Sequence, residues 1–332
     1  MTQKEALDIL KMGHSAFVTG AAGSGKTYLL NQYIKYLKDN DVEVGVTAST
    51  GIAASHMGGQ TIHAWSGLGI RSSLSPCDIE NLEEKPYLWK RFEKTKVLII
   101  DEISMLHHFR LNLVDQVLQS FKRNNLPFGG LQVIFCGDFF QLPPVSREGE
   151  EESLFAYHSE SWNNLAPKIC YLEEQHRQND DAFLEILNSI RKNNVTPEII
   201  YKLNSSCQGK VNSKDEPTKI YSHNANVDIE NERELEKIPG KMFEYEMINK
   251  GQEFLAETLK KGCLSPERLR LKKDARVIFT KNNFEEGYVN GTQGIITACD
   301  NSGITVRTVS GKTINVNPAR WTIEEDGKIK AE

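Results

Sequence analysis

The sequence predicts an α/β protein in which a doubly wound parallel sheet is followed by a small region of short strands. Three observations lead to this prediction. Short apolar runs alternate with segments of helical periodicity up to about residue 170, as in sheets covered by helices on both faces. A glycine-rich loop at residues 20–27 joins the first apolar run to the first helical segment. From about residue 268 the pattern changes to period-two alternation between glycine turns, which is typical of a small barrel.

The composition is that of an ordinary globular protein. The 332 residues are 39% hydrophobic and 26% charged, and they leave room for about two domains at one per ~150 residues. No apolar run approaches the ~18 residues of a membrane span, so we expect no membrane contact. The amino-terminal MTQKEALDIL has the pattern of an amphipathic helix and not of an export signal. We therefore expect a cytoplasmic location, or a nucleoid or nuclear one, and no secretion.

Cysteine spacing and net charge narrow the function classes further. The six cysteines stand far apart, with no C-x-x-C pair and no histidine at metal-ligand spacing, which predicts reduced thiols and no zinc site. The net charge is −5, so the chain as a whole lacks the basic character of many nucleic-acid-binding domains. Any contact with nucleic acid has to be local.

The expected elements of the first domain follow the periodicity of its apolar residues. Residues 16–18 form an apolar strand, and residues 29–37 carry apolar side chains at helical spacing. A second strand runs through residues 42–46. Continuous apolar runs at 97–100 and 131–138 are of the kind that is buried on both faces of a parallel sheet.

The later part of the chain predicts helices first and then strands. Residues 183–190 again show helical spacing, and residues 219–223 are expected to form a strand edge. Beyond residue 268, five segments alternate with period two: RLRLKKDARVIFT, TQGIITACD, ITVRTVSG, KTINVN and RWTIEE. These segments predict the strands of a small barrel.

The loop GAAGSGKT fits the phosphate-binding pattern G-x-x-x-x-G-K-[ST] in full. Its glycines let the backbone turn its N–H groups toward an anion, while Lys26 reaches the β and γ phosphates and Thr27 can ligate Mg²⁺. A chance glycine turn is the alternative. The nucleotide-binding residues expected here are Gly20, Ala22, Gly23, Ser24, Gly25, Lys26 and Thr27.

Two carboxylates follow the apolar run at 97–100. Asp101 is expected in the Mg²⁺ shell, and Glu102 is expected to orient or deprotonate an attacking water. The alternative is that the two carboxylates cap a helix. With the phosphate loop, this pair predicts hydrolysis of a nucleoside triphosphate.

Seven segments together resemble the Pif-one type of superfamily-one DNA helicase, a relative of RecD. They occur in the order and rough spacing of that family: GAAGSGKT, TASTGIAA, GGQTIHAWSGL, IIDEISM, GDFFQLPPV, LEEQHRQND and VNGTQG. The resemblance implies a RecA-like P-loop NTPase domain over residues 1–170, with a small wedge subdomain within about 66–95. It further implies a partial second RecA-like domain over 171–267 and an SH3-like β-barrel over 268–332.

The same resemblance implies roles for three further residues at the nucleotide. Gln141, held in a stiff loop by Pro143 and Pro144, is expected to contact the γ-phosphate; the alternative is a buried glutamine that satisfies loop backbone. Gln3 is expected to read the adenine edge and so select ATP, unless it is a frayed surface residue. Arg177 is expected to reach the γ-phosphate from the second domain, or to pair with a neighbouring glutamate on the surface.

DNA contacts are expected from several separate segments. Ser49 and Thr50 can bind phosphates with nearby backbone N–H groups, and His63 and Trp65 can meet a base or sugar, unless they belong to the core. By the family pattern Asn282 and Asn290 mark the junction with the barrel, where a strand-supporting role competes with DNA contact. A basic cluster at residues 268–276 is either a DNA contact or a solvated strand face.

The resemblance implies an ATP- and Mg²⁺-dependent 5′-to-3′ DNA helicase that acts as a monomer on single-stranded DNA and on junctions or duplex. In this family a segment like Q-x-P-L-x-x-A-W-A-x-T-I-H-K-S-Q-G and a last arginine motif follow the barrel, whereas the present sequence ends at WTIEEDGKIKAE. We therefore expect these 332 residues to bind Mg-ATP but not to unwind DNA robustly. The alternatives are a non-motor fragment that binds nucleic acid and ATP without turnover, and a P-loop ATPase that acts on protein.

Overall fold

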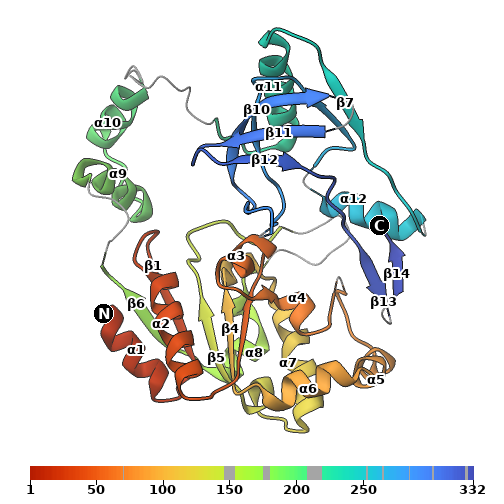
Figure 1. Cartoon of the computed structure of the whole chain (residues 1–332). Helices are drawn as coiled ribbons and strands as arrows, with labels where there is room; N and C mark the ends of the chain where they lie inside the picture. The colour runs from red at the N-terminus through yellow and green to blue at the C-terminus, as the bar shows by residue number, and fades with distance from the viewer. Residues whose placement is uncertain are drawn as a thin grey trace. The chain divides into compact units, whose positions relative to one another are not determined.

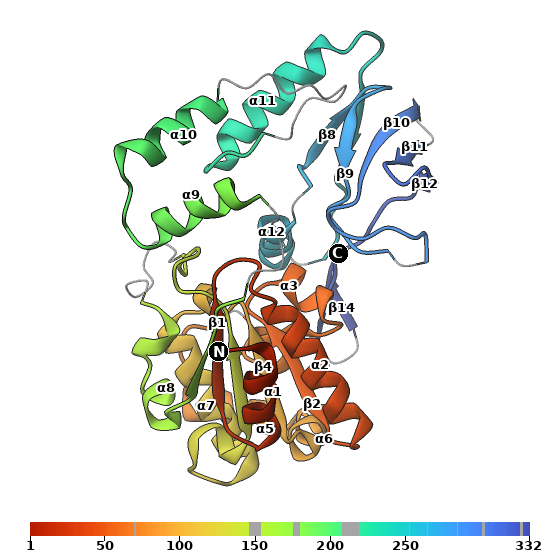
Figure 2. The same ribbon diagram turned by 90° about the vertical axis from the view of Figure 1, so that its left-hand side faces the viewer.

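The computed structural model contains two compact units, Met1–Gly209 and Lys210–Glu332 (Figures 1 and 2). It describes the chain except for residues 70, 146–153, 175–179, 208–218, 252, 264, 284, 301–302 and 326–327. The predicted division at residues 170 and 267 stays a prediction. Within the described residues, no helix is long and apolar enough to cross a membrane.

The first unit is built on a six-stranded sheet with the order β3-β2-β4-β5-β1-β6, in which every pair is parallel. Its strands are β1 (Ala16–Gly20), β2 (Val44–Ala48), β3 (Gln60–Thr61), β4 (Val97–Asp101), β5 (Gln132–Cys136) and β6 (Lys168–Leu172). The four strands expected in this region are confirmed. Because β5 and β1 are direct neighbours, the loops that leave their carboxyl ends lie at one edge of the sheet.

The sheet is buried on both faces, as its continuous apolar runs predict. Along β4, Leu98 and Ile100 belong to one core cluster, while Val97 and Ile99 belong to the cluster on the opposite face. This alternation arises because successive side chains of a strand point to opposite faces. Helices α1 and α2 cover one face and α7 the other (Figures 1 and 2).

The helices of the first unit begin where the sequence supplies caps. Thr2 caps α1 in a capping box with Glu5, and Ser75 does the same for α5 with Asp78. The helices are α1 (Gln3–Lys11), α2 (Lys26–Asp39), α3 (Gly51–His56), α4 (Ile62–Trp65), α5 (Pro76–Glu83), α6 (Pro86–Lys94), α7 (His108–Lys122), α8 (Glu160–Leu165), α9 (Asp181–Arg191) and α10 (Pro197–Cys207). Three short 3₁₀ turns complete the unit: η1 (Ile103–Met105), η2 (Pro127–Gly130) and η3 (Ala156–His158).

The expected wedge region shares the core of the first unit. Leu68, Leu82, Leu88 and Phe92 all lie in the same cluster as β4 and β5. These residues therefore anchor α5 and α6 to the sheet. The role of the region as a wedge stays a prediction.

The second unit consists of helices and small antiparallel sheets. Its elements are α11 (Asn224–Lys237), β7 (Phe243–Glu246), α12 (Glu253–Gly262), β8 (Arg268–Leu271), β9 (Arg276–Ile278), β10 (Gln293–Asp300), β11 (Gly303–Thr308), β12 (Thr313–Val316), β13 (Ile323–Glu325) and β14 (Lys328–Ala331). The main sheet has the order β12-β11-β10-β9, and β7-β8 and β13-β14 form two-stranded sheets. Among the described residues, β12 and β9 are the outer strands of this sheet and do not pair with each other, so closure into an SH3-like barrel stays a prediction.

Two strand predictions need correction. The segment 219–223 is irregular and leads directly into α11, so the expected strand edge there is wrong. The long run that begins at residue 268 is two strands, β8 and β9, which pair with different partners. The chain turns between them at Asp274, whose φ of 69° lies in the left-handed region.

Candidate nucleotide site and DNA-facing segments

The glycine-rich loop connects β1 to α2, as the phosphate-binding pattern requires. Gly25 caps α2 with a φ of 81°, a conformation that glycine adopts without strain. A Cβ at Gly20 would lie 2.6 Å from the carbonyl oxygen of Leu172 on the neighbouring β6, so only glycine fits there. Lys26 Nζ donates hydrogen bonds to the carbonyl oxygens of Gly20 at 2.9 Å and Ala21 at 3.1 Å. The loop therefore places an ammonium group and a helix amino terminus at one point.

Two further features of this loop fit a phosphate-bearing ligand, a buried hydroxyl without a hydrogen bond among the described residues and a contact from α1. The Ser24 hydroxyl is fully buried and makes no hydrogen bond to any residue that the structure describes. Gln3 Nε2 donates to the carbonyl oxygen of Ser24 at 3.3 Å from the first turn of α1. Gln3 is half-buried in a capped helix, so the alternative of a frayed surface residue is wrong.

The two predicted carboxylates lie at the carboxyl end of β4. Asp101 is buried, and its Oδ1 accepts a hydrogen bond from the Glu102 amide at 2.9 Å. Glu102 has a φ of 52°, and its side chain makes no capping bond to η1, so the helix-cap alternative is wrong for Glu102.

Burial raises the pKa of Glu102, and the charges of Asp101 and Asp138 add to this effect, while Lys26 opposes it. The charges of Asp101, Asp138 and Lys26 therefore all act on the Glu102 carboxyl.

Gln141 lies in the loop that follows β5, and its side chain faces a carboxylate. The side chain is exposed, and Nε2 donates to Asp138 Oδ2 at 3.2 Å. The alternative of a buried glutamine that satisfies loop backbone is therefore wrong. The backbone N–H of Gln141 also donates to the backbone carbonyl oxygen of Asp138 at 2.9 Å, which closes a turn between the two residues.

Asp138 is a site residue that the sequence did not reveal. Its side chain is 2% exposed and is paired with Arg191, the last residue of α9, through bonds of 2.7 and 2.9 Å. The Arg191 guanidinium also lies over the ring of Phe140, 4.6 Å from its centroid. Nothing in the local sequence predicts a pair 53 residues apart.

Ser49 and Thr50, expected at DNA phosphates, are bonded within the protein. The Ser49 hydroxyl donates to the carbonyl oxygen of Glu102 at 2.8 Å, and its amide donates to the carbonyl oxygen of Asp101 at 3.1 Å. The Thr50 hydroxyl accepts from the Ala53 amide at the start of α3. Ser49 therefore connects its segment to the backbone of Asp101, the predicted Mg²⁺ ligand, and of Glu102, the predicted catalytic residue.

Trp65 is a core residue, which corrects its expected role in stacking on a base. Its side chain is 3% exposed, and its ring meets Phe92 edge-on with the centroids 5.0 Å apart. A ring with no open face cannot stack on a base. His63 is half-buried, and burial, followed by the charges of Arg110 and His107, lowers its pKa to about 4. His63 is therefore neutral at physiological pH.

In the second unit the predicted contact residues support the chain locally. Asn282 Oδ1 accepts a hydrogen bond from the Asn290 amide at 2.7 Å, which favours the strand-supporting alternative for Asn282. Of the basic cluster, Lys272 is buried and donates to the carbonyl oxygens of Glu236 and Ile238 at the end of α11. Arg270 pairs with Glu232. Lys272 and Arg270 of this cluster therefore bond to residues at α11 within the second unit.

Comparison with known proteins places the chain in a family. The sequence model described as PIF1-like helicase matches residues 2–216. This chain belongs to the PIF1-like helicase family. It is 50% identical over 303 residues to the ATP-dependent DNA helicase Pif1 of Psychrobacter sp., covering 89% of this chain and 46% of that protein. It is 34% identical to the Bdellovibrio bacteriovorus Pif1, covering 99% of this chain and 74% of that protein.

Solved structures of PIF1-like helicases share the fold. The crystal structure of Pif1 from Candida albicans matches with a TM-score of 0.88 at 32% identity, over 99% of this chain and 81% of that one. Bacteroides Pif1 bound to single-stranded DNA matches with a TM-score of 0.75 at 31% identity, over 99% and 77%. These matches confirm the RecA-like α/β prediction. The chain spans about half the length of the first curated relatives it matches, 46% and 51%.

Arg177, the remaining residue that the PIF1-like pattern places at the nucleotide, lies outside the described residues.

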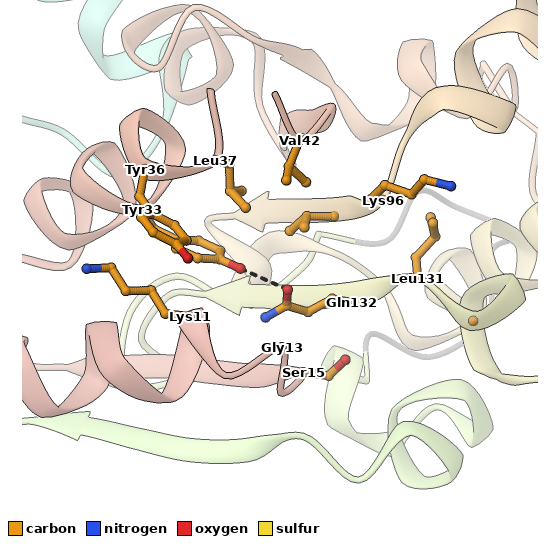
Figure 3. A pocket seen from close by; sticks show the side chains of 12 residues that line it. Lys11, Gly13, Ser15, Tyr33, Tyr36, Leu37, Val42, Lys96, Leu131 and Gln132 are labelled. Atoms are coloured by element: carbon orange, nitrogen blue, oxygen red, sulfur yellow. Dashed lines mark hydrogen bonds between the residues drawn. The ribbon is translucent and has the colours of Figure 1, made fainter. Parts of the chain in front are cut away.

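A cavity of about 460 Å³ lies at the other edge of the sheet, next to the amino ends of β1, β4 and β5 (Figure 3). Its floor is held by the Tyr33 hydroxyl, whose single proton faces two acceptors, Gln132 Oε1 at 2.8 Å and the Leu10 carbonyl oxygen at 3.0 Å. In this PIF1-like chain the cavity is thus separate from the phosphate loop.

Proposed function

We propose that this protein is an ATP-dependent DNA helicase or translocase that moves 5′ to 3′ along single-stranded DNA and unwinds duplex. One observation carries the proposal. The phosphate loop follows β1, while Asp101 with Glu102 follows β4 and the Asp138–Gln141 turn follows β5. Since these strands are parallel and adjacent in the order β4-β5-β1, all three groups meet at the carboxyl edge of the sheet, where nucleotides bind in such folds.

Each group has a chemical task in ATP hydrolysis. Lys26 neutralises the β and γ phosphates, and Gln3 sits where it would select the adenine ring. Thr27 and Asp101 would hold Mg²⁺ together with phosphate oxygens, and the ion would offset the charge that develops during phosphoryl transfer.

Within the described residues, no group of three or more His, Cys, Asp or Glu side chains could hold a metal ion. Glu102 orients the attacking water and accepts its proton, and the raised pKa of its carboxyl favours this role. Gln141 contacts the γ-phosphate, and Arg177 would add a second cation from its own segment.

Ser49 gives a route from DNA to this chemistry. A serine hydroxyl has one proton to donate, and that of Ser49 is donated to the Glu102 carbonyl oxygen. A DNA phosphate that attracts this proton, or that moves the Ser49–Thr50 segment, would therefore shift the backbone of Glu102. We propose further DNA contacts at Thr50, His63 and Asn290, while Asn282 supports the backbone of Asn290.

The relatives support the choice of substrate. They are named ATP-dependent DNA helicases, and related Bacteroides structures contain single-stranded DNA alone or with ADP-AlF3. On this basis we propose single-stranded DNA and junctions or duplex as partners of a monomeric motor. Genome maintenance, including repair, recombination, replication and telomere maintenance, is the process that such a motor would serve.

Steady-state ATP hydrolysis tests the proposal, with and without single-stranded DNA, alongside Lys26→Ala. We expect DNA to raise the rate severalfold and the substitution to abolish it, because removing the ammonium leaves the phosphate charge without its main protein partner. Nucleotide and DNA binding without turnover would instead select the non-motor alternative. Turnover that DNA does not change would favour an ATPase that acts on another substrate.

A further inference from the structure

Arg191 holds a buried carboxylate in place at the phosphate edge of the sheet. Among the described residues, the two oxygens of Asp138 accept four hydrogen bonds. Arg191 supplies two of them through a planar fork, at 2.7 Å to Oδ2 and 2.9 Å to Oδ1. The Phe140 amide donates to Oδ1, and Gln141 Nε2 donates to Oδ2, each at 3.2 Å. The carboxylate is therefore fixed in both position and rotation.

The pair is built as a rigid unit and not as a loose surface contact. The Asp138 side chain is 2% exposed and that of Arg191 is 18% exposed. The ring of Phe140 lies on the guanidinium face, so Arg191 is held in its plane by the carboxylate and across it by an aromatic ring. A lysine could supply the charge but neither the fork nor the stacking surface.

The carboxylate in turn decides which way the Gln141 amide points. Burial raises the pKa of Asp138, but hydrogen bonds from Arg191, from the Phe140 backbone and from Gln141 outweigh it and lower the pKa. Asp138 is therefore ionised and can only accept hydrogen bonds. Gln141 must turn its NH₂ group toward Asp138, which leaves its second N–H and its Oε1 directed elsewhere.

We propose that Arg191 is a positioning residue for recognition of the terminal phosphate of a nucleoside triphosphate. Arg191 fixes Asp138, Asp138 fixes the orientation of the Gln141 amide, and Gln141 meets the γ-phosphate. This inference rests on the proposed function, in which Gln141 contacts that phosphate. It adds to the site a residue from α9, a helix that follows the LEEQHRQND segment in the sequence.

The test compares binding of Mg-ADP with binding of a non-hydrolysable Mg-ATP analogue. ADP occupies the phosphate loop without a γ-phosphate, so its affinity reports an intact site independently of Gln141. The variants are Arg191→Met, which removes the fork, and Arg191→Lys, which retains only the charge. The full 332-residue chain is used throughout, and both dissociation constants are measured by calorimetry.

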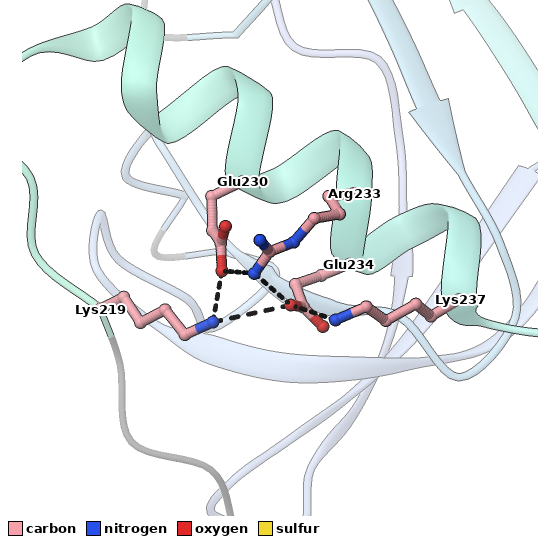
Figure 4. Close-up of polar contacts among 5 residues, drawn as sticks. All are labelled: Lys219, Glu230, Arg233, Glu234 and Lys237. Carbon is pink, nitrogen blue, oxygen red and sulfur yellow. Dashed lines mark hydrogen bonds and ion pairs between the residues drawn. The ribbon is translucent and has the colours of Figure 1, made fainter.

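Arg233 provides a matched control. It lies on α11 and pairs with Glu230 and Glu234 in an exposed cluster with Lys219 and Lys237 (Figure 4). Its side chain is 58% exposed, and surface pairs of this kind contribute little to stability. Arg233→Met removes an arginine–carboxylate pair of similar length within the second unit, so its affinities for both nucleotides should match the wild type.

For Arg191→Met we expect the preference for the analogue over ADP to fall about tenfold, which corresponds to about 1.4 kcal/mol, with ADP affinity within about twofold of wild type. Arg191→Lys should recover part of the preference. Equal loss of both affinities in Arg191→Met, with Arg191→Lys like wild type, would mean that the pair only holds α9 and would overturn the inference. A preference unchanged in both variants would overturn it as well. If the wild type binds neither nucleotide, the proposed function fails first, and the inference fails with it.

Discussion

Trp65 is the residue for which sequence and structure make opposite predictions about a single substitution. If its ring stacks on DNA, Trp65→Ala weakens DNA binding and leaves the fold intact. If it is a core residue, the same substitution destabilises the first unit. The structure favours the second outcome, because the ring is 3% exposed and packs edge-on against Phe92.

The expected loss follows from the surface that the indole buries. A buried aromatic side chain removes roughly 150–250 Å² from water, which at ~25 cal/mol per Å² gives about 4–6 kcal/mol as an upper estimate. Truncation of a core Trp or Phe to alanine typically costs about 3–5 kcal/mol, part of it through the cavity left behind. A domain is stable by only ~5–15 kcal/mol, so Trp65→Ala should remove a large share of the total.

Thermal unfolding by circular dichroism measures this loss. For a unit of this size, each kcal/mol lowers the Tm by about 2–4 °C, so we expect a fall of roughly 6–20 °C. Trp65→Phe retains most of the apolar volume and should cost much less. Tyr201→Ala removes an aromatic ring that is 73% exposed and should leave the Tm close to wild type. The reasoning is refuted if Trp65→Ala unfolds at the wild-type temperature while its affinity for single-stranded DNA, measured by fluorescence anisotropy, falls severalfold.

Three further predictions concern packing and charge in the same unit. A Cβ at Gly45 would lie 2.7 Å from Cζ2 of Trp65, so Gly45→Ala should cost about 1–3 kcal/mol in urea unfolding. Gly45→Ala should lower the free energy of unfolding by less in a Trp65→Phe protein. Equal losses in the two proteins would contradict the close packing of Gly45 against the Trp65 ring. Tyr33→Phe removes a donor from Gln132 Oε1 and should lower the unfolding free energy by about 1 kcal/mol, whereas no change would mean that water replaces the bond. Asp138 has a lowered pKa when folded, so its stabilisation is present above its unfolded pKa of about 3.9 and is lost as the pH falls below that value. Between pH 6 and 3, the free energy of unfolding measured with urea should therefore fall less steeply in Asp138→Asn than in the wild type. An equal slope in the two proteins would refute this prediction.

The parallel sheet could be predicted from the sequence because its strands are buried on both faces. Such strands appear as continuous apolar runs, and the runs at 97–100 and 131–138 became β4 and β5 with small changes at their ends. The strand expected at 219–223 failed because three of its five residues are polar and it has no partner strand among the described residues of the second unit. Apolar content alone does not specify a strand whose pairing is absent.

In the candidate site, too, features formed by consecutive residues could be predicted, and contacts between distant residues could not. The phosphate loop and the pair at residues 101–102 could be predicted because their chemistry is written in consecutive residues. The pairing of Asp138 with Arg191 could not, since it depends on how α9 returns to the loop after β5. Trp65 was assigned wrongly because a tryptophan next to polar residues has the same sequence pattern whether it lies in the core or on the surface.

The electrostatics of the site explain why such a long-range pair belongs there. Asp101, Glu102 and Asp138 are close enough for the charges of the two aspartates to raise the pKa of Glu102, and an incoming triphosphate brings still more negative charge. A nearby like charge disfavours the ionised form of a carboxyl group, and a nearby cation favours it. Asp138 is neutralised inside the protein by Arg191, which leaves Asp101 and Glu102 for the roles we propose for them, at Mg²⁺ and at the attacking water. A variant that removes Arg191 therefore does more than loosen a helix, because it leaves the Asp138 charge uncompensated beside Gln141, where we propose that the γ-phosphate binds.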